Sequence, residues 1–255
     1  MLLINCERQG AVAVVTLNNP PLNLVTLSLS KQLRATLQSL DADDEVRVIV
    51  LTGSGHKAFC VGSDIKEFPE VWDNVIEKKL QKENETFNTI EFLNKPVIAA
   101  MEGVVCGGGF EMAMACDLRV LSDSGKIALP EINLGVFPGS GGLFRLPKLI
   151  GAARAVELMM TGTFVEAQQC IAWGMVNRLA PAGTVLEAAV SLAQEIALKP
   201  REAIKLIKRG VREIGMQPTE QCFLQNLRFS ENIFRTVDCA EGVAAFLEKR
   251  EAKFL

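Results

Sequence analysis

Short apolar strands alternate with helical segments along the first 180 residues, and this alternation is the feature that most restricts the fold. Residues 2–8, 11–17, 46–53, 95–103, 118–123 and 126–131 have the apolar, β-branched character of strands, and residues 26–43 and 110–117 carry apolar residues at helical spacing. Sequences in which strands and helices alternate in this way form α/β architectures. We therefore expect an α/β fold.

The last third of the chain has a different pattern. From Gly141 onward the apolar spacing is almost wholly helical, and a Pro- and Gly-containing stretch at 180–183 separates two parts without a long linker. The sequence therefore predicts a core over residues 1–180 and a C-terminal helical region over residues 181–255.

Composition excludes several classes of function. The 255 residues are 49% apolar with a net charge of −3, which gives no general attraction to nucleic acid or to an anionic membrane. No basic N-terminal segment leads into a long apolar stretch, and no apolar run approaches membrane-spanning length. Seven cysteines without C-x-x-C spacing suit reduced thiols buried as small apolar residues, with no zinc site. We expect a cytoplasmic protein without a membrane span, a metal or a nucleic-acid partner.

The only histidine, His56, lies in a Gly- and Ser-rich turn. Such a residue is more often solvated than catalytic. A Ser-His-Asp triad, a histidine-ligated metal or a histidine base would each need this one side chain. Any acid–base chemistry is therefore expected from carboxylates.

Three glycines, Gly107 to Gly109, precede a short apolar helix that has Glu111 in its first turn. Glycine is unfavourable in helices, while the N–H groups at a helix start lack intrahelical partners and attract negative charge. This segment could hold a phosphate or a developing oxyanion. It matches neither a P-loop nor a dinucleotide-binding fingerprint.

A second turn joins a strand-like run to a new helix at residues 57–68. Asp64 and Glu67 have capping-box spacing there, and the turn is either purely structural or presents the Ser63 N–H to a ligand oxygen.

Glu111 and Glu131 also leave two interpretations open. Each carboxylate is either catalytic or only a favourable residue at the start of a helix or turn.

These motifs together resemble one known family. The segments FCVGSDIKEF, GGGFEMAMACDLRV, LPEINLGVFPGSGGLFRLPKLIG, WGMVNRL and AEGVAAFLEKR are similar, in order and spacing, to the crotonase (enoyl-CoA hydratase/isomerase) superfamily over essentially the full chain. Several of these segments are most similar to the carnitinyl-CoA (crotonobetainyl-CoA) dehydratase branch of that superfamily. The resemblance implies a crotonase-like ββα spiral core with a C-terminal helical trimerisation region.

The resemblance also implies roles for four residues. The backbone N–H groups of Ser63 and Gly108 would form an oxyanion hole for a thioester carbonyl, with Ser63 standing where alanine is common among fatty-acid hydratases. Glu111 would orient and deprotonate water, and Glu131 would exchange the α-proton. Two retained glutamates favour hydration or dehydration of an enoyl-CoA over Δ3–Δ2 isomerisation. Isomerisation and a non-catalytic binding protein remain the alternatives.

An acyl-CoA thioester is the implied substrate, with no cofactor other than the coenzyme A portion of that substrate. The implied substrate-binding residues are Lys57, Cys60, Gly62, Asp64, Ile65, Lys66, Gly107 and Gly139. The two lysines either meet the adenosine phosphates or are simply solvated, and the Gly139 turn either borders the acyl pocket or only begins a helix.

Four further side chains have less specific predictions. Trp72 and Phe87 are either walls of the acyl pocket or core residues. Arg145 and Asp117 are expected to be structural partners. The resemblance also implies a homo-oligomer, a trimer or a dimer of trimers, with contacts through the C-terminal helices.

Overall fold

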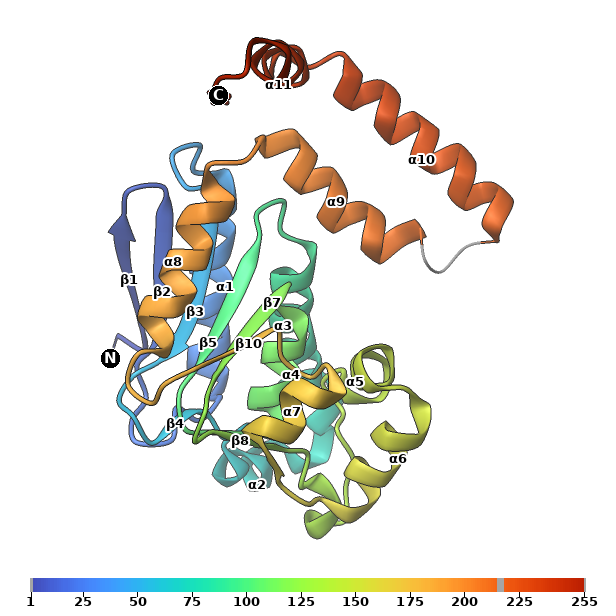
Figure 1. Cartoon of the computed structure of the whole chain (residues 1–255). Helices are drawn as coiled ribbons and strands as arrows, with labels where there is room; N and C mark the ends of the chain where they lie inside the picture. The colour runs from blue at the N-terminus through green and yellow to red at the C-terminus, as the bar shows by residue number, and fades with distance from the viewer. Residues whose placement is uncertain (1, 215–217, 255) are drawn as a thin grey trace.

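A six-stranded sheet forms the centre of the computed structural model, which describes residues 2–214 and 218–254. The strand order is β1-β2-β3-β5-β7-β10; β1 and β2 pair antiparallel, and each later pair is parallel (Figure 1). The strands are β1 Ile4–Gln9, β2 Val12–Leu17, β3 Val48–Gly53, β5 Val97–Met101, β7 Leu118–Ser122 and β10 Arg178–Ala180.

Both faces of this sheet are buried, which explains why its central strands are continuously apolar. Val48 and Val50 face a core cluster that includes Ala189 of α8 (Val185–Ala197). Ile49 and Leu51 face the opposite, larger cluster. This alternation follows from the two-residue period of a strand.

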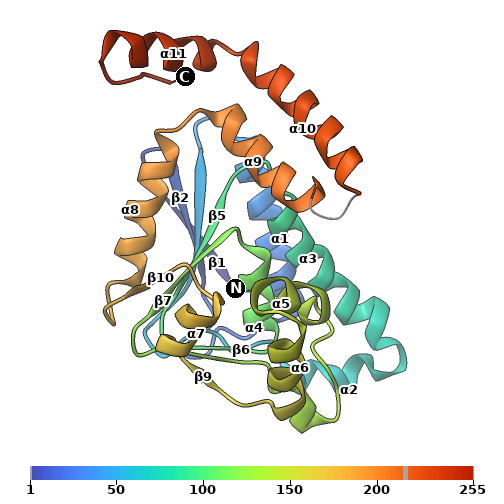
Figure 2. The same cartoon turned by 45° about the vertical axis from the view of Figure 1, so that its right-hand side comes forward.

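Helices form the layers on the two sides of the sheet, with α8 on one side and α1 and α3 on the other (Figure 2). The α-helices are α1 Leu27–Ala42, α2 Phe68–Val71, α3 Gln81–Phe92, α4 Gly108–Ala115, α5 Gly142–Ile150, α6 Ala152–Thr161, α7 Ala167–Trp173, α8, α9 Arg201–Ile214, α10 Thr219–Phe234 and α11 Val237–Glu248. Shorter helical segments are η1 Ile65–Glu67, η2 Trp72–Asn74, η3 Ile76–Leu80 and η4 Glu131–Leu134.

A second, four-stranded sheet positions the candidate site. It contains β4 Ala58–Cys60, β6 Val104–Cys106, β8 Lys126–Ala128 and β9 Val165–Glu166. The first three of these are parallel, and Cys60 pairs with Val105 while Cys106 pairs with Ala128. The carboxyl ends of parallel strands meet at one edge of a sheet. The three loops that follow β4, β6 and β8 therefore begin side by side.

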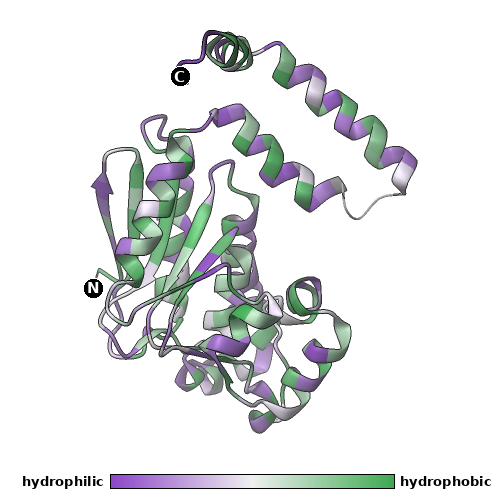
Figure 3. Ribbon diagram, viewed as in Figure 1, coloured by the Kyte–Doolittle hydropathy of each residue, from purple (hydrophilic) through white to green (hydrophobic). Residues whose placement is uncertain are grey.

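The C-terminal helices α9 to α11 extend beyond the sheet layers, and hydrophobic and hydrophilic residues alternate along α10 (Figure 3). Contacts to the core come from α9, where Lys208 donates to Asp117 Oδ2 at 2.8 Å and Arg212 donates to the Glu91 carbonyl at 2.7 Å. The predicted boundary at residue 180 falls before α8, which packs on the sheet. The helices that leave the core begin at Arg201.

Three local predictions need correction. The region after residue 141 is less uniformly helical than expected, because it contains β9 and the sixth strand of the main sheet, β10. The capping box at residues 64–67 is only half formed: Asp64 caps η1 by accepting from the Lys66 N–H at 3.0 Å, but Glu67 accepts from Leu27 N–H instead. The Asp64 N–H already donates to the Val25 carbonyl, which leaves Glu67 free for this other partner.

The third correction concerns the cysteines. All seven are free thiols, as expected, and Cys60, Cys106, Cys116 and Cys170 are buried. Cys6 is exposed, and Cys222 and Cys239 are half-buried, so burial does not extend to the whole set.

Candidate active site

Two turns with left-handed backbone lie at the shared edge of β4, β6 and β8. Gly62 has φ of +97° and Gly107 has φ of +56°, conformations that other residues rarely adopt. A Cβ on Gly62 would lie 2.9 Å from the Gly108 nitrogen, so no side chain fits between the turns. This contact gives a physical reason for glycine at both turns.

The two turns bring together the backbone N–H groups of Ser63 and Gly108. An added Cβ on Gly108 would lie 3.5 Å from the Ser63 nitrogen and 3.5 Å from Ser63 Oγ. Among the described residues, neither N–H donates to a protein acceptor, whereas the Gly107 N–H donates to the Ala128 carbonyl at 3.1 Å. Gly108 also begins α4, where the helix dipole favours negative charge. The structure therefore places two unpaired backbone donors close to each other at the start of α4.

Glu111 projects from the first turn of α4 and is only 2% exposed. Its Oε1 accepts from the Ser140 N–H at 2.8 Å and from the Gly142 N–H at 2.7 Å. Both donors belong to the loop that enters α5, so this loop fixes the carboxyl group. The apolar length of α4 explains the burial, because every residue of this helix is buried.

Glu131 begins η4, directly after β8 and Pro130. An added Cβ on Gly107 would lie 3.2 Å from Glu131 Oε1, so the carboxyl group lies over the glycine turn. Glu131 Oε2 is buried and has no hydrogen-bond partner among the described residues. An unpaired buried oxygen is costly, and it is free to bind a water or a substrate atom.

The two carboxyl groups influence each other's protonation. The pKa of Glu111 is raised to about 8, mainly by burial; the negative charges of Glu131 and Glu83 also raise it, while the Gly142 and Ser140 N–H groups lower it. Burial also raises the pKa of Glu131. The pair is thus expected to titrate as a unit that retains a proton near neutral pH. This arrangement allows one carboxyl group to act as an acid and the other as a base.

The other predicted substrate-binding residues occupy two kinds of environment. Lys57, Ile65 and Lys66 are exposed around the Ser63 turn, and Asp64 is half-buried there. Cys60 is completely buried, and burial raises the pKa of its thiol to about 12.

Gly139 lies in the loop before α5, where its carbonyl accepts from Asn84 Nδ2 at 3.1 Å. Of the two possible walls of the acyl pocket, Phe87 is fully buried in the large core cluster. Trp72 is 73% exposed. The core interpretation therefore applies to Phe87 but not to Trp72.

Arg145 and Asp117 make the structural contacts expected of them. Arg145 is buried and bonds to Glu91 at 2.6 Å, to Asn88 at 2.8 Å and to the Ser140 carbonyl at 3.1 Å. Asp117 accepts from the Val97 N–H at 2.8 Å and from Lys208. His56 is exposed in its turn, as expected of a solvated residue.

Sequence reasoning missed three residues beside the site: Lys79, Glu83 and Ser140. Lys79 and Glu83 are fully or almost fully buried and form an ion pair of 3.1 Å. Glu83 also accepts from Ser63 Oγ at 2.7 Å and from Ser140 Oγ at 3.3 Å. The only sequence signal for Lys79 and Glu83 is the i,i+4 spacing of their opposite charges, which normally indicates an exposed helical pair.

Two other findings limit the kinds of site that the chain offers. Within residues 2–214 and 218–254, no group of three or more His, Cys, Asp or Glu side chains is arranged to hold a metal ion. In the same residues, no helix has both the length and the apolar character needed to cross a lipid bilayer.

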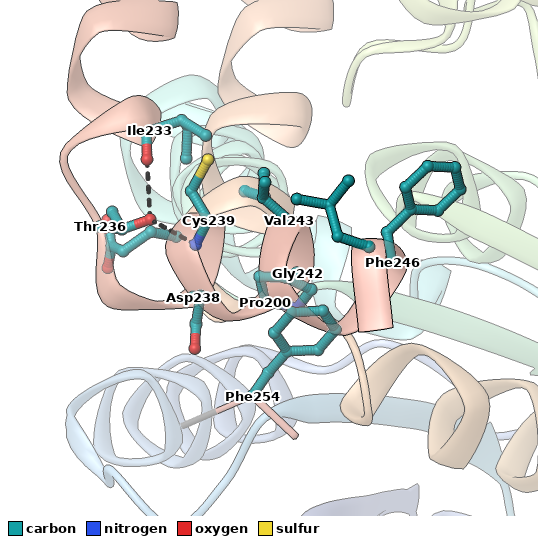
Figure 4. A pocket seen from close by; sticks show the side chains of 12 residues that line it. Pro200, Ile233, Thr236, Asp238, Cys239, Gly242, Val243, Phe246 and Phe254 are labelled. Atoms are coloured by element: carbon teal, nitrogen blue, oxygen red, sulfur yellow. Dashed lines mark hydrogen bonds between the residues drawn. The ribbon is translucent and has the colours of Figure 1, made fainter. Parts of the chain in front are cut away.

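A separate apolar cavity of about 370 Å³ lies among α9, α10, α11 and the chain end. The Phe254 ring lies beside Gly242 in it (Figure 4). None of the predicted site residues lines this cavity.

Comparisons with known proteins extend over nearly the whole chain. Residues 7–255 match the family model described as enoyl-CoA hydratase/isomerase. A short-chain-enoyl-CoA hydratase of Clostridium acetobutylicum is 36% identical over 251 residues, covering 96% of this chain and 94% of that protein. A carnitinyl-CoA dehydratase of Citrobacter koseri is 34% identical over 257 residues, covering 97% and 96% of the two chains. Because hydratases and carnitinyl-CoA dehydratases match about equally well, the carnitinyl branch is only one possibility.

A solved structure has the same fold. The crystal structure of an enoyl-CoA hydratase from Bacillus anthracis superposes with a TM-score of 0.95 at 32% identity and covers 99% of both chains. The predicted crotonase-like α/β fold is thereby confirmed. The chain belongs to the enoyl-CoA hydratase/isomerase family, the crotonase superfamily.

Proposed function

We propose that this protein is an enoyl-CoA hydratase or dehydratase that adds water to, or removes it from, the 2,3 double bond of an enoyl-CoA thioester. One observation carries the proposal. Two unpaired backbone N–H groups, of Ser63 and Gly108, lie close together beside two carboxyl groups, those of buried Glu111 and half-buried Glu131. The family membership supports the same chemistry.

The pair holds one proton, and in the reactive form this proton lies on Glu131, so that Glu111 is ionised although its burial opposes ionisation. In the hydration direction, Glu111 then takes a proton from water while the water oxygen bonds to the β-carbon. The electrons of the double bond move toward the thioester, and its carbonyl oxygen becomes an enolate oxygen held by the two N–H groups. Each well-placed donor of this type contributes about 2.7–4 kcal/mol to transition-state stabilisation. Protonated Glu131 then delivers its proton to the α-carbon. Dehydration is the same sequence reversed.

The retention of both carboxyl groups favours hydration over Δ3–Δ2 isomerisation. Moving a double bond requires one group that removes and returns a proton, whereas adding water requires a base for the water and an acid for the α-carbon. Glu111, held by the segment that enters α5, would be the base, and Glu131, with its unpaired oxygen, would be the acid.

The test follows the loss of conjugated-thioester absorbance with crotonyl-CoA and crotonobetainyl-CoA. Wild type should consume at least one substrate, and Glu111→Gln and Glu131→Gln should each lower kcat by about 10²–10⁴-fold. Glu85→Gln is the matched control and should retain full activity, because Glu85 is a half-buried carboxylate that pairs with Arg34. The faster substrate indicates the acyl class.

Other outcomes separate the alternatives. If Glu111→Gln retains most of its activity on a 3-enoyl-CoA, the protein is an isomerase. If wild type binds coenzyme A esters and transforms none of them, the binding-protein interpretation replaces the catalytic one.

Coenzyme A recognition and assembly complete the proposal. Lys57 and Lys66 are exposed beside the Ser63 turn, where they could meet the adenosine phosphates.

The C-terminal helices leave large apolar side chains uncovered, with Val211 79% and Phe246 83% exposed. Apolar surface of this extent favours a subunit interface. We expect a trimer or a dimer of trimers, which light scattering on the eluted protein would detect as three or six protomers.

A further inference from the structure

One buried carboxylate touches both halves of the proposed active site. Glu83 lies on α3 and is 1% exposed. Both of its oxygens lie 2.7 Å from Ser63 Oγ, and Oε2 lies 3.3 Å from Ser140 Oγ. The first serine carries an N–H of the proposed oxyanion hole, and the Ser140 N–H holds Glu111 at 2.8 Å. A single side chain therefore connects the hole to the base.

We propose that Glu83 is a positioning residue that keeps the Ser63 turn and the Ser140 loop at a fixed separation. This inference rests on the proposed function. It assigns to Glu83 no contact with the substrate; Glu83 acts through Ser63 and Ser140. Because a displacement of about 1 Å at reacting groups can cost about 10²-fold in rate, such a brace has a direct effect on turnover.

The surroundings of Glu83 make this brace rigid. Lys79, which has no exposed surface, pairs with Glu83 at 3.1 Å and with Glu67 at 2.7 Å. Glu67 in turn accepts from the Leu27 N–H at the start of α1. A buried charge is tolerated only when it is paired and hydrogen-bonded, so these partners have little freedom to move. The network thus joins the Ser63 turn to α1, η3 and α3.

Glu83 also acts on the site through its charge. The charged and titratable groups that face it are Lys79 on η3, Cys60 on β4 and Glu111 on α4. Glu111 is faced by both Glu83 and Glu131. A negative charge at Glu83 favours the protonated form of the pair. Removing this charge should lower the pH at which the pair loses its last proton.

The experiment compares wild type with Glu83→Gln, using Glu85→Gln on the same helix as the control. We expect Glu83→Gln to lower kcat by about 10- to 100-fold with KM changed less than about threefold. The alkaline limb of the kcat profile should move to lower pH. The enolate absorbance of bound acetoacetyl-CoA, which reports how well the hole binds a charged oxygen, should decrease. The control should match wild type in all three measurements.

Two results would overturn the positioning role. One is a Glu83→Gln variant with wild-type kcat. The other is a loss of kcat without a shift of the alkaline limb or a loss of enolate absorbance, since this would make Glu83 a residue for stability alone. Failure of the proposed function is a different result: wild type itself would then hydrate no enoyl-CoA.

Serine variants keep the proposal testable if Glu83→Gln does not fold. Ser63→Ala and Ser140→Ala each remove one hydroxyl and leave all charges in place. Each should lower kcat by about 3- to 10-fold, and the double variant should lose less than the product of the two, because both hydroxyls act through one carboxylate. A double loss equal to the product would show independent serines and contradict the brace.

Discussion

Replacing Glu111 by glutamine should inactivate the protein and stabilise it at alkaline pH. Burial raises the pKa of Glu111 from 4.5 to about 8, so the folded protein resists ionisation of this group. At about 1.4 kcal/mol per pKa unit, ionised Glu111 costs the fold on the order of 4 to 5 kcal/mol. Glutamine removes this cost and retains an oxygen that can accept from Ser140 and Gly142. Its NH₂ group needs a new partner, however, which returns about 1–3 kcal/mol. The net gain above about pH 8 is therefore expected to be about 1–4 kcal/mol.

The pH dependence identifies the cause of this gain. Between pH values of about 4.5 and 8, Glu111 binds a proton in the folded chain but not in the unfolded chain. The free energy of unfolding must therefore fall as pH rises through this window, and the full penalty is present above it. Glu131 contributes in the same direction because burial also raises its pKa. The difference between wild type and Glu111→Gln measures the contribution of Glu111 together with its coupling to Glu131.

Urea unfolding at one fixed protomer concentration, near pH 5.5 and near pH 8.5, measures this difference. The variant should gain about 3 kcal/mol relative to wild type between the two conditions. Parallel stability curves for the two proteins would refute the reasoning, since they would show that Glu111 has the same proton affinity in the folded and unfolded chains. The assay requires no substrate, so its result is independent of which acyl group the enzyme uses.

Three further predictions test neighbouring features. Glu131→Gln should lower kcat by about 10²–10⁴-fold in the absorbance assay while changing the free energy of unfolding, measured with urea, by less than about 1 kcal/mol. A loss of kcat accompanied by a large loss of stability would indicate a structural role. Gly109→Ala should destabilise the fold by about 1–3 kcal/mol or more, because the new Cβ would lie 2.6 Å from the Cys60 carbonyl carbon. Gly139→Ala, whose Cβ would have no contact under 3.7 Å, is the control, and equal unfolding midpoints for the two variants would contradict the clash. The Cys60 thiol should resist iodoacetamide in the folded protein at pH values below its pKa of about 12, whereas mass spectrometry should find exposed Cys6 modified first; the reverse order would contradict the burial of Cys60.

The glycine turns could be predicted from sequence because each depends on a local cause. Gly62 and Gly107 lie within two residues of the ends of the parallel strands β4 and β6, and both have the left-handed backbone that favours glycine. Glu111 follows Gly107 at the start of α4, so its position is also local. The resemblance to a family then supplied the expected roles, which the fold comparison does not itself test.

The brace at Glu83 could not be predicted because its cause is tertiary. Lys79 and Glu83 have the i,i+4 spacing of an ordinary surface pair, and nothing in that spacing indicates burial. Ser63 and Ser140 are separated from Glu83 by 20 and 57 residues in the sequence. The same limit explains why the capping box was wrong at Glu67. The N–H that this side chain would bind was already paired with Val25, in a part of the chain far from the turn.

The position of Lys79 distinguishes Glu83 from Glu111 and Glu131. Burial raises the pKa of Glu83, but the lysine at 3.1 Å and the two hydroxyl donors act in the opposite direction and lower it. Glu111 and Glu131 form no ion pair with lysine or arginine among the described residues, and the nearby Arg145 is paired with Glu91 instead. A pair of buried carboxyl groups without a cation lowers its energy by keeping a proton. Lys79 thus opposes the effect of burial at Glu83, whereas no cation in the described part of the chain does so at Glu111 or Glu131, and the catalytic pair therefore retains the proton that hydration delivers to the α-carbon.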